Sequence, residues 1–271
     1  MIVELFGPPA AGKTTLAHAL AGRLQEQGHA VELILSYRPT ESSVVCGTAT
    51  GIHDATLVLR RLTRPVAEML TTLGHPVSQS RAIRLAANLM CLLPPKNLMW
   101  FIRLSQYILR LSHSWQRASQ ASHIVLLDQA FVQVVCSLVL LGRKSDESLI
   151  IRALDCTPRS DVLIRIDAPY PTLEHRLHDR MHLQSRIERL FELDLKTNLE
   201  SVHVVDRIDG LLRQRQIVPI CATSIDQHSL HETTERIRMQ IEAKPRAAQW
   251  ADGSRLGPKG QQTVYGAGMK C

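Results

Sequence analysis

The sequence predicts a three-layer α/β fold with a five-stranded parallel sheet. Short runs of valine, isoleucine and leucine recur along the chain, helical patterns separate them, and a glycine-containing loop directly follows the first run. Near-continuous apolar strands separated by helices are typical of a parallel sheet that helices cover on both faces. With 271 residues, 45% of them hydrophobic and 21% charged, the chain is long enough to bury such a core.

The five expected strands are residues 2–6, 30–35, 123–128, 161–167 and 216–221. In open parallel sheets, ligands bind beyond the carboxyl ends of the strands. Polar or glycine residues stand at the ends of four of these runs, so we expect them to gather at one edge of the sheet: Gly7, Arg38, Asp128 and Asp167.

Residues 7–14 match the phosphate-binding pattern G-x-x-x-x-G-K-[ST]. The match lies between the first strand and a helical pattern over 14–27, which is the context that this motif requires. Gly7 and Gly12 allow a tight turn in which backbone N–H groups face phosphate oxygens at a helix N-terminus. Lys13 is placed to reach the β- and γ-phosphates, and the Thr14 hydroxyl to hold Mg²⁺. We therefore expect a P-loop NTPase fold that binds ATP and Mg²⁺ through Gly7, Pro8, Pro9, Ala10, Ala11, Gly12, Lys13, Thr14 and Thr15.

The stretch between the second and third strands is too long for one loop. Apolar residues recur there at helical spacing over 54–73, 81–93 and 98–120, which predicts a helical insertion over residues 41–120. Residues 244–271 contain several glycines and few apolar residues, and predict a disordered tail. The remaining residues, 1–243, are expected to form one domain.

Composition restricts the partners. A net charge of +7 and a pI near 9.3 suit an anionic ligand, but only 4% of residues are aromatic and no basic run carries interleaved aromatics, so nucleic acid is not expected. The six cysteines form no C-x-x-C pair, and the first strand begins at once, which favours reduced thiols in a cytoplasmic protein. The apolar stretch from Leu85 to Ile102 is interrupted by Pro94 and Pro95, so no membrane span is expected.

Asp128 ends the third expected strand beside the glycine loop. A carboxylate at that position can hold Mg²⁺, either directly or through a water, or accept a proton from an acceptor hydroxyl. It can also simply cap the helix that begins after it. The sequence leaves the roles of metal ligand and catalytic base open.

Arginines follow the fourth expected strand. Arg176 and Arg180 are four residues apart and therefore share one face of a helix, while Leu173 and Leu177 form an apolar face. Arg186 and Arg189 continue the basic run. A solvated face is one explanation. The other is a lid over residues 170–205 whose arginines clamp the phosphates during transfer, with Arg176 and Arg180 as catalytic residues.

With these residues in place, the chain resembles the thymidylate-kinase-like branch of the P-loop nucleoside and nucleotide kinases. Four segments carry the resemblance: Gly7–Thr15, Ser36–Glu41, Leu126–Gln129 and Asp161–Pro169 with the arginines that follow. The resemblance implies that Arg38 and Glu41 contact the acceptor. Gln129 stands where thymidylate kinases usually carry an arginine, and the segment after the second strand lacks their R-E-P-G-G, which argues against thymidylate as the substrate.

These observations predict an ATP-dependent kinase that moves the γ-phosphate to a small-molecule acceptor such as a nucleoside, a nucleotide or another small alcohol. Lys13, Asp128, Arg176 and Arg180 are the expected catalytic residues. The alternative is a P-loop NTPase that acts as a regulatory switch without such an acceptor. An N-K-x-D segment after a strand and a paired Asp-Glu at the third strand are both missing, which argues against G-protein-type and motor-type NTPases. The partner is thus a small acceptor, and a homodimer is left open.

Overall fold

The structure is a computed structural model that describes residues 1–36, 76–143, 146–183, 193–223 and 227–243. Its centre is a five-stranded sheet in the order β2-β3-β1-β4-β5. All neighbouring strands are parallel. The strands are β1 (Ile2–Phe6), β2 (Val31–Ile34), β3 (Ile124–Leu127), β4 (Val162–Asp167) and β5 (Ile220–Thr223).

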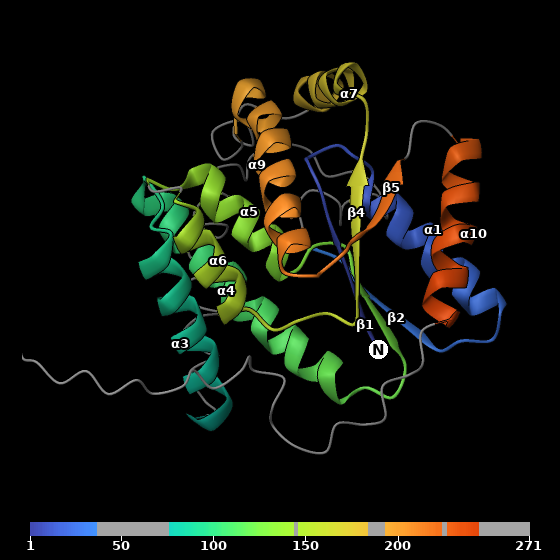
Figure 1. Cartoon of the computed structure of the whole chain (residues 1–271), viewed down its shortest axis with the longest axis horizontal. Helices are drawn as coiled ribbons and strands as arrows, with labels where there is room; N and C mark the ends of the chain where they lie inside the picture. Colours follow the sequence, from blue (N-terminus) through green and yellow to red (C-terminus); the bar gives the residue numbers. More distant parts are fainter. Residues whose placement is uncertain (37–75, 144–145, 184–192, 224–226, 244–271) are drawn as a thin grey trace, which may run out of the picture.

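Helices cover both faces of this sheet (Figure 1). On one side lie α1 (Lys13–Glu26) and α10 (Gln227–Ala243). The other side carries α3 (Pro76–Leu92), α4 (Leu98–Gln120), α5 (Phe131–Leu141), α6 (Glu147–Cys156) and α9 (Leu195–Gln214). Helix α7 (Tyr170–Leu183) lies beyond the arrowhead of β4, at the carboxyl edge of the sheet (Figure 1). The predicted three-layer α/β fold with a parallel sheet is confirmed.

The apolar core consists of two clusters, one on each face of the sheet, because successive side chains of the central strands point to opposite faces. Ile2 and Phe6 of β1 belong to the cluster with α3, α4, α5, α6 and α9, whereas Val3 and Leu5 belong to the cluster with α1, α7 and α10. Each strand therefore presents successive side chains to opposite faces. Glu4 lies on the same face as Ile2 and Phe6, so a carboxyl group is buried at the α5 side of the central strand.

Four strands lie within one or two residues of their predicted positions, and the fifth strand, predicted over 216–221, is present but begins four residues later than predicted. Helix α9 runs to Gln214, Gln216 has a positive φ of 61°, and β5 begins only at Ile220. Arg215 and Gln216 form the turn that leaves the helix. Pro219 has no N–H to donate to a ladder, so pairing with β4 starts after it.

The described part of the insertion, residues 76–120, is helical as predicted. Helix α4 matches the predicted range 98–120, whereas α3 begins at Pro76 rather than near residue 81. Proline suits the first turn of a helix because its missing N–H would have no partner there. Within the described ranges, no helix combines the length and the apolar character that crossing a bilayer requires. The predicted disordered tail, 244–271, and residues 41–75 of the insertion lie outside the described residues.

Candidate phosphate-transfer site

The glycine loop joins the carboxyl end of β1 to the first turn of α1. Gly7 has a φ of 154°, and a Cβ atom added to it would lie 2.1 Å from the backbone oxygen of Ile166. No side chain fits there without moving β4. Gly12 has a φ of 96° and forms the N-cap of α1, a left-handed conformation that favours glycine. Both motif glycines are therefore required by local geometry.

Lys13 is buried at the start of α1. Its Nζ donates to the carbonyl oxygens of Gly7 at 2.8 Å and Pro8 at 2.7 Å. The ammonium group thus lies within the curve of the loop, where N–H groups of the α1 N-terminus also point. A cation beside a helix N-terminus is an arrangement that favours an anion such as phosphate.

Asp128 follows β3 and is 1% exposed. Its Oδ2 accepts hydrogen bonds from the hydroxyls of Thr14 at 3.0 Å and Ser36 at 3.2 Å, and its Oδ1 accepts one from the Ser36 N–H at 2.6 Å. Three segments thus converge on one carboxylate: the loop, the residues after β2 and the residues after β3.

These oxygen atoms suit Mg²⁺. The ion prefers oxygen ligands and is commonly held by one or two protein groups together with phosphates and water. Thr14 and Asp128 would supply the protein ligands, and the ion would neutralise charge on the phosphates. Within the described ranges, no group of three or more His, Cys, Asp or Glu side chains could hold a metal ion.

A second carboxyl group lies behind the loop. Glu4 Oε1 accepts the Val132 N–H at 2.6 Å, at the first turn of α5, where the N-cap residue Ala130 provides no side-chain bond. Burial raises the pKa of Glu4 to about 8, although hydrogen bonds from Val132 and the Ser160 side chain act in the opposite direction. The next residue, Gln133, accepts the Gly7 N–H through Oε1 at 3.0 Å.

The insertion approaches the same edge of the sheet. Tyr107 of α4 donates from its hydroxyl to the backbone oxygen of Gln129 at 3.2 Å, one residue after Asp128. Burial and the nearby carboxylates of Asp128 and Glu4 raise the pKa of Tyr107, so its hydroxyl stays a neutral donor. Helix α4 is therefore tied to the segment that carries Asp128.

Helix α7 approaches the loop from the opposite direction. Leu173 and Leu177 are buried, as the predicted apolar face requires. Arg176 donates to the carbonyl oxygen of Ala10 at 3.3 Å, which brings one predicted lid arginine to the loop. Arg180, one turn later, shares that face of α7.

Asp167 ends β4 but its carboxylate is held by Arg165, through hydrogen bonds of 2.8 and 3.1 Å. Arg165 also contacts Asp206 and Asp209 of α9. Asp167 therefore belongs to an ion-pair network between β4 and α9, and this role was not expected from the sequence.

The structure thus brings Lys13, Thr14, Asp128 and Arg176 together around the loop. Arg38 and Glu41, predicted to contact the acceptor, and the lid arginines Arg186 and Arg189 lie outside the described residues. Ser36, Tyr107, Glu4 and Gln133 were not predicted. Two of them left a signal in the sequence: Glu4 interrupts the buried run IVELF, and Gln133 interrupts the apolar helix FVQVVCSLVLL. A buried polar group normally has a hydrogen-bond partner, and these residues find theirs in each other's segments.

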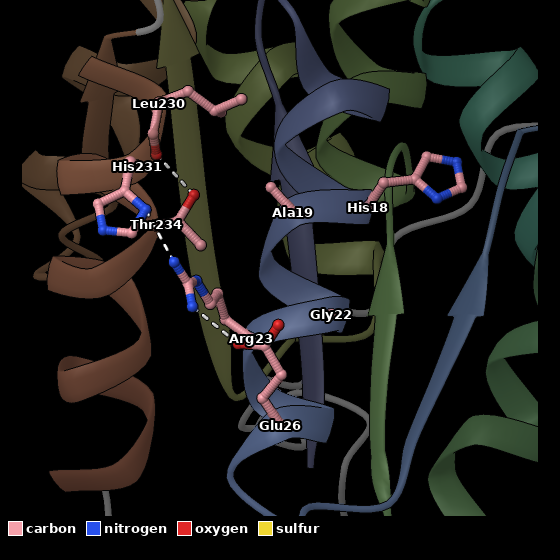
Figure 2. A pocket seen from close by; sticks show the side chains of 8 residues that line it. All are labelled: His18, Ala19, Gly22, Arg23, Glu26, Leu230, His231 and Thr234. Atoms are coloured by element: carbon pink, nitrogen blue, oxygen red, sulfur yellow. Dashed lines mark hydrogen bonds and ion pairs between the residues drawn. The ribbon is translucent and has the colours of Figure 1, made fainter. Parts of the chain in front are cut away.

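A separate pocket of about 300 Å³ lies between α1 and α10 (Figure 2). Figure 2 shows Arg23 directed toward His231 and Glu26, while His18 points away from α10. Arg23 is paired with Glu26 at 2.8 Å and Glu235 at 3.3 Å, which neutralises its charge. The lining residues are His18, Ala19, Gly22, Arg23, Glu26, Leu230, His231 and Thr234, and none belongs to the loop.

Comparison with known proteins gives little beyond this geometry. No family model and no curated protein matches the chain. Among solved structures, the chain is similar to deoxyadenosine kinase from M. mycoides with bound dCTP, at a TM-score of 0.42 and 12% identity over 90% of this chain and 100% of that one. The same enzyme with its products dCMP and a flexible dCDP matches at a TM-score of 0.45, 11% identity and the same coverage. At these values the likeness carries no argument about activity, and the thymidylate-kinase-like assignment stays a prediction.

Proposed function

We propose that the protein is an ATP-dependent phosphotransferase that moves the γ-phosphate of ATP to a small-molecule acceptor. The observation that carries this proposal is the arrangement of Lys13, Thr14 and Asp128 around the glycine loop. A buried ammonium group, a helix N-terminus and a carboxylate bonded to the loop threonine meet at one place. Phosphoryl transfer needs mainly positioning and charge neutralisation, which such groups provide.

Each side chain takes a defined part in this proposal. Lys13 exchanges the loop carbonyls for the β- and γ-phosphates when the nucleotide binds. Thr14 and Asp128 would hold Mg²⁺, which would neutralise charge on the phosphates when bound. Arg176, which already contacts the loop at Ala10, turns toward the transferring phosphoryl group and offsets charge on its oxygens. Arg180 supports it from the same face of α7.

For Asp128 we favour the role of Mg²⁺ ligand over that of base. Its two oxygens accept three hydrogen bonds, and one of these comes from Thr14, the residue whose hydroxyl is the second expected Mg²⁺ ligand. Because Asp128 Oδ2 already lies beside the Thr14 hydroxyl, the two groups would be placed to hold Mg²⁺ together.

Transfer to an acceptor is favoured over simple hydrolysis because two elements flank the loop. Helix α4 of the insertion is tied to Gln129 beside Asp128, and α7 is tied to Ala10 through Arg176. Helices α4 and α7, one on each side of the loop, would hold an acceptor between them and limit the access of water to the γ-phosphate. We therefore expect slow hydrolysis without acceptor and rapid consumption of ATP with it.

The test is a screen with γ-labelled ATP and Mg²⁺. Nucleosides, nucleoside monophosphates, sugars and amino-alcohols are offered in turn, and label on the acceptor is measured together with total ATP consumption. Labelled acceptor that is absent with Lys13→Ala supports the proposal. If no small molecule becomes labelled and hydrolysis rises instead when a protein partner is added, the protein is a switch NTPase.

A further inference from the structure

We infer that Gln133 is a positioning residue for the phosphate-binding loop, and that Glu4 sets the helical turn from which Gln133 reaches it. This inference deepens the proposed function and rests on it for its role in ATP binding. The hydrogen bonds themselves are properties of the fold. They connect β1, the first turn of α5 and the first residue of the loop.

Gly7 is constrained from three directions. Its N–H donates to Gln133 Oε1 at 3.0 Å, its carbonyl oxygen accepts the Lys13 ammonium at 2.8 Å, and its Cα faces the backbone of Ile166 too closely for any side chain. The Gln133 bond therefore orients the same peptide segment that holds the lysine. Without the bond between Gly7 and Gln133, the backbone at Gly7 would be free to rotate. The N–H groups of the following loop residues would then no longer point in one direction.

Glu4 determines where Gln133 stands. The first N–H groups of a helix have no partner inside the helix, and Ala130 provides no capping side chain for α5. Glu4 fills this place from the neighbouring strand by accepting the Val132 N–H at 2.6 Å. Because Gln133 is the next residue, a shift of this turn would move its amide away from Gly7.

Both polar groups are placed against strong local preferences. A carboxyl group in a strand whose five residues are all buried, and a partly buried glutamine in a mostly apolar helix, each lose hydration, which costs free energy unless a hydrogen-bond partner is present. Their hydrogen bonds offset this cost, and both join β1 and the start of the loop to the first turn of α5, which follows Asp128 in the chain. Glu4 and Gln133 therefore hold the two halves of the proposed site, loop and carboxylate, in one register.

The test compares Gln133→Met with Gln133→Glu and with the control Ser137→Ala. Methionine keeps the length of the side chain but removes the acceptor, whereas glutamate restores an acceptor oxygen. Ser137 lies one turn later, and its hydroxyl donates to the backbone oxygen of Gln133 without touching the loop. Amide exchange of Gly7 is followed by NMR in protein labelled with ¹⁵N-glycine, and Mg²⁺-ATP affinity is measured by calorimetry alongside Tm.

We expect the Gly7 amide of Gln133→Met to exchange at least about tenfold faster and ATP to bind about tenfold more weakly, the effect of one lost hydrogen bond. Ser137→Ala should change neither quantity, and Gln133→Glu should restore protection of Gly7. Unchanged Gly7 protection or unchanged ATP affinity in Gln133→Met would overturn the inference. Failure of the wild-type protein to bind ATP would instead refute the proposed function, while the Gly7 amide would still report on the loop.

Glu4 is tested in the same way. Glu4→Gln keeps an acceptor oxygen for the Val132 N–H and should leave the Gly7 amide protected. Glu4→Leu removes the acceptor and should expose both amides, Val132 and Gly7, to faster exchange. If Glu4→Leu does not fold, Glu4→Gln and Gln133→Met still decide the matter, since loss of Gly7 protection in Glu4→Gln would contradict the assigned role.

Discussion

The Thr14 hydroxyl donates a 3.0 Å hydrogen bond to Asp128 Oδ2, which joins the phosphate-binding loop to the end of β3 across 114 residues of sequence. This contact places the two expected Mg²⁺ ligands together. Because each group can also bond the other, the pair is held in position before any ion binds. Such pre-organisation reduces the reorganisation that binding and catalysis require.

Asp128→Asn should raise the Mg²⁺ concentration for half-maximal activity about tenfold, since an amide oxygen is a weaker ligand than a carboxylate. The pH profile of kcat/KM should keep its acidic limb, because in our proposal Asp128 is not the base. Asp146→Asn, at the exposed start of α6, is the control. Loss of the acidic limb at an unchanged Mg²⁺ requirement would assign Asp128 as the base instead.

Lys13→Ala should lower kcat/KM on the order of 10³-fold, equivalent to about 4 kcal/mol of transition-state stabilisation. The fold should survive, because the Lys13 ammonium bonds loop carbonyls and contributes nothing to the apolar clusters. Activity and Tm are measured for each variant. Lys196→Ala is the control, because it removes the same charge from an exposed position. Turnover near that of the wild type would refute the assignment of the loop.

Gly7→Ala should impair ATP binding strongly, because the new Cβ would lie 2.1 Å from the Ile166 oxygen and must displace either β4 or the loop. Gly210→Ala is the matched control. Gly210 lies inside α9 with nothing within 4 Å of an added Cβ, so alanine there should stabilise the protein by about 0.5–1 kcal/mol. Calorimetric ATP titration and thermal unfolding test both changes, and equal behaviour of the two variants would contradict the proposed geometry.

Arg176→Ala should reduce kcat about 10²-fold or more with a smaller effect on the KM for ATP, since the arginine is expected to act mainly in the transition state. The exposed Arg159→Ala is the control for loss of positive charge. Hydrogen exchange of residues 170–205 with and without ATP and Mg²⁺ reports on the lid. Equal exchange in both states, together with an unchanged kcat in Arg176→Ala, would remove the lid from the mechanism.

Glu4 predicts a pH dependence of stability. Burial raises its pKa to about 8 in the folded state, whereas an unfolded glutamate titrates near 4.3. Its stabilising effect is complete below the unfolded pKa and is lost as the pH rises, because only the unfolded state gains from ionisation until the pH passes about 8. Unfolding free energies of Glu4→Gln and the wild type, measured by denaturant titration from pH 5 to pH 9, should therefore differ increasingly in favour of the variant up to about pH 8 and by a constant amount above it. A difference that is constant over the whole range would contradict the raised pKa.

The fold could be predicted in most of its parts because its signals are local. Apolar runs located four strands to within one or two residues, and the periodicity over 98–120 located α4. The fifth strand was displaced because Ile217 and Val218 resemble a strand in composition. These residues instead connect the end of α9 to Pro219, after which the strand begins. Val218 is accordingly 67% exposed rather than buried in the sheet.

The position and shape of the glycine loop could be predicted from the sequence alone, because both motif glycines, the start of a helix and the Lys13-Thr14 pair all lie within eight consecutive residues. The partners of that loop were decided only by the tertiary structure. Ser36 is hydrogen-bonded to Asp128, 92 residues away in the sequence, and Gly7 is hydrogen-bonded to Gln133, 126 residues away. Apolar periodicity shows that Glu4 and Gln133 are polar residues within apolar runs, but it does not show which group each one bonds. That choice follows from the order β3-β1-β4 in the sheet and from the packing of α5 against β1, which brings distant segments within hydrogen-bond distance.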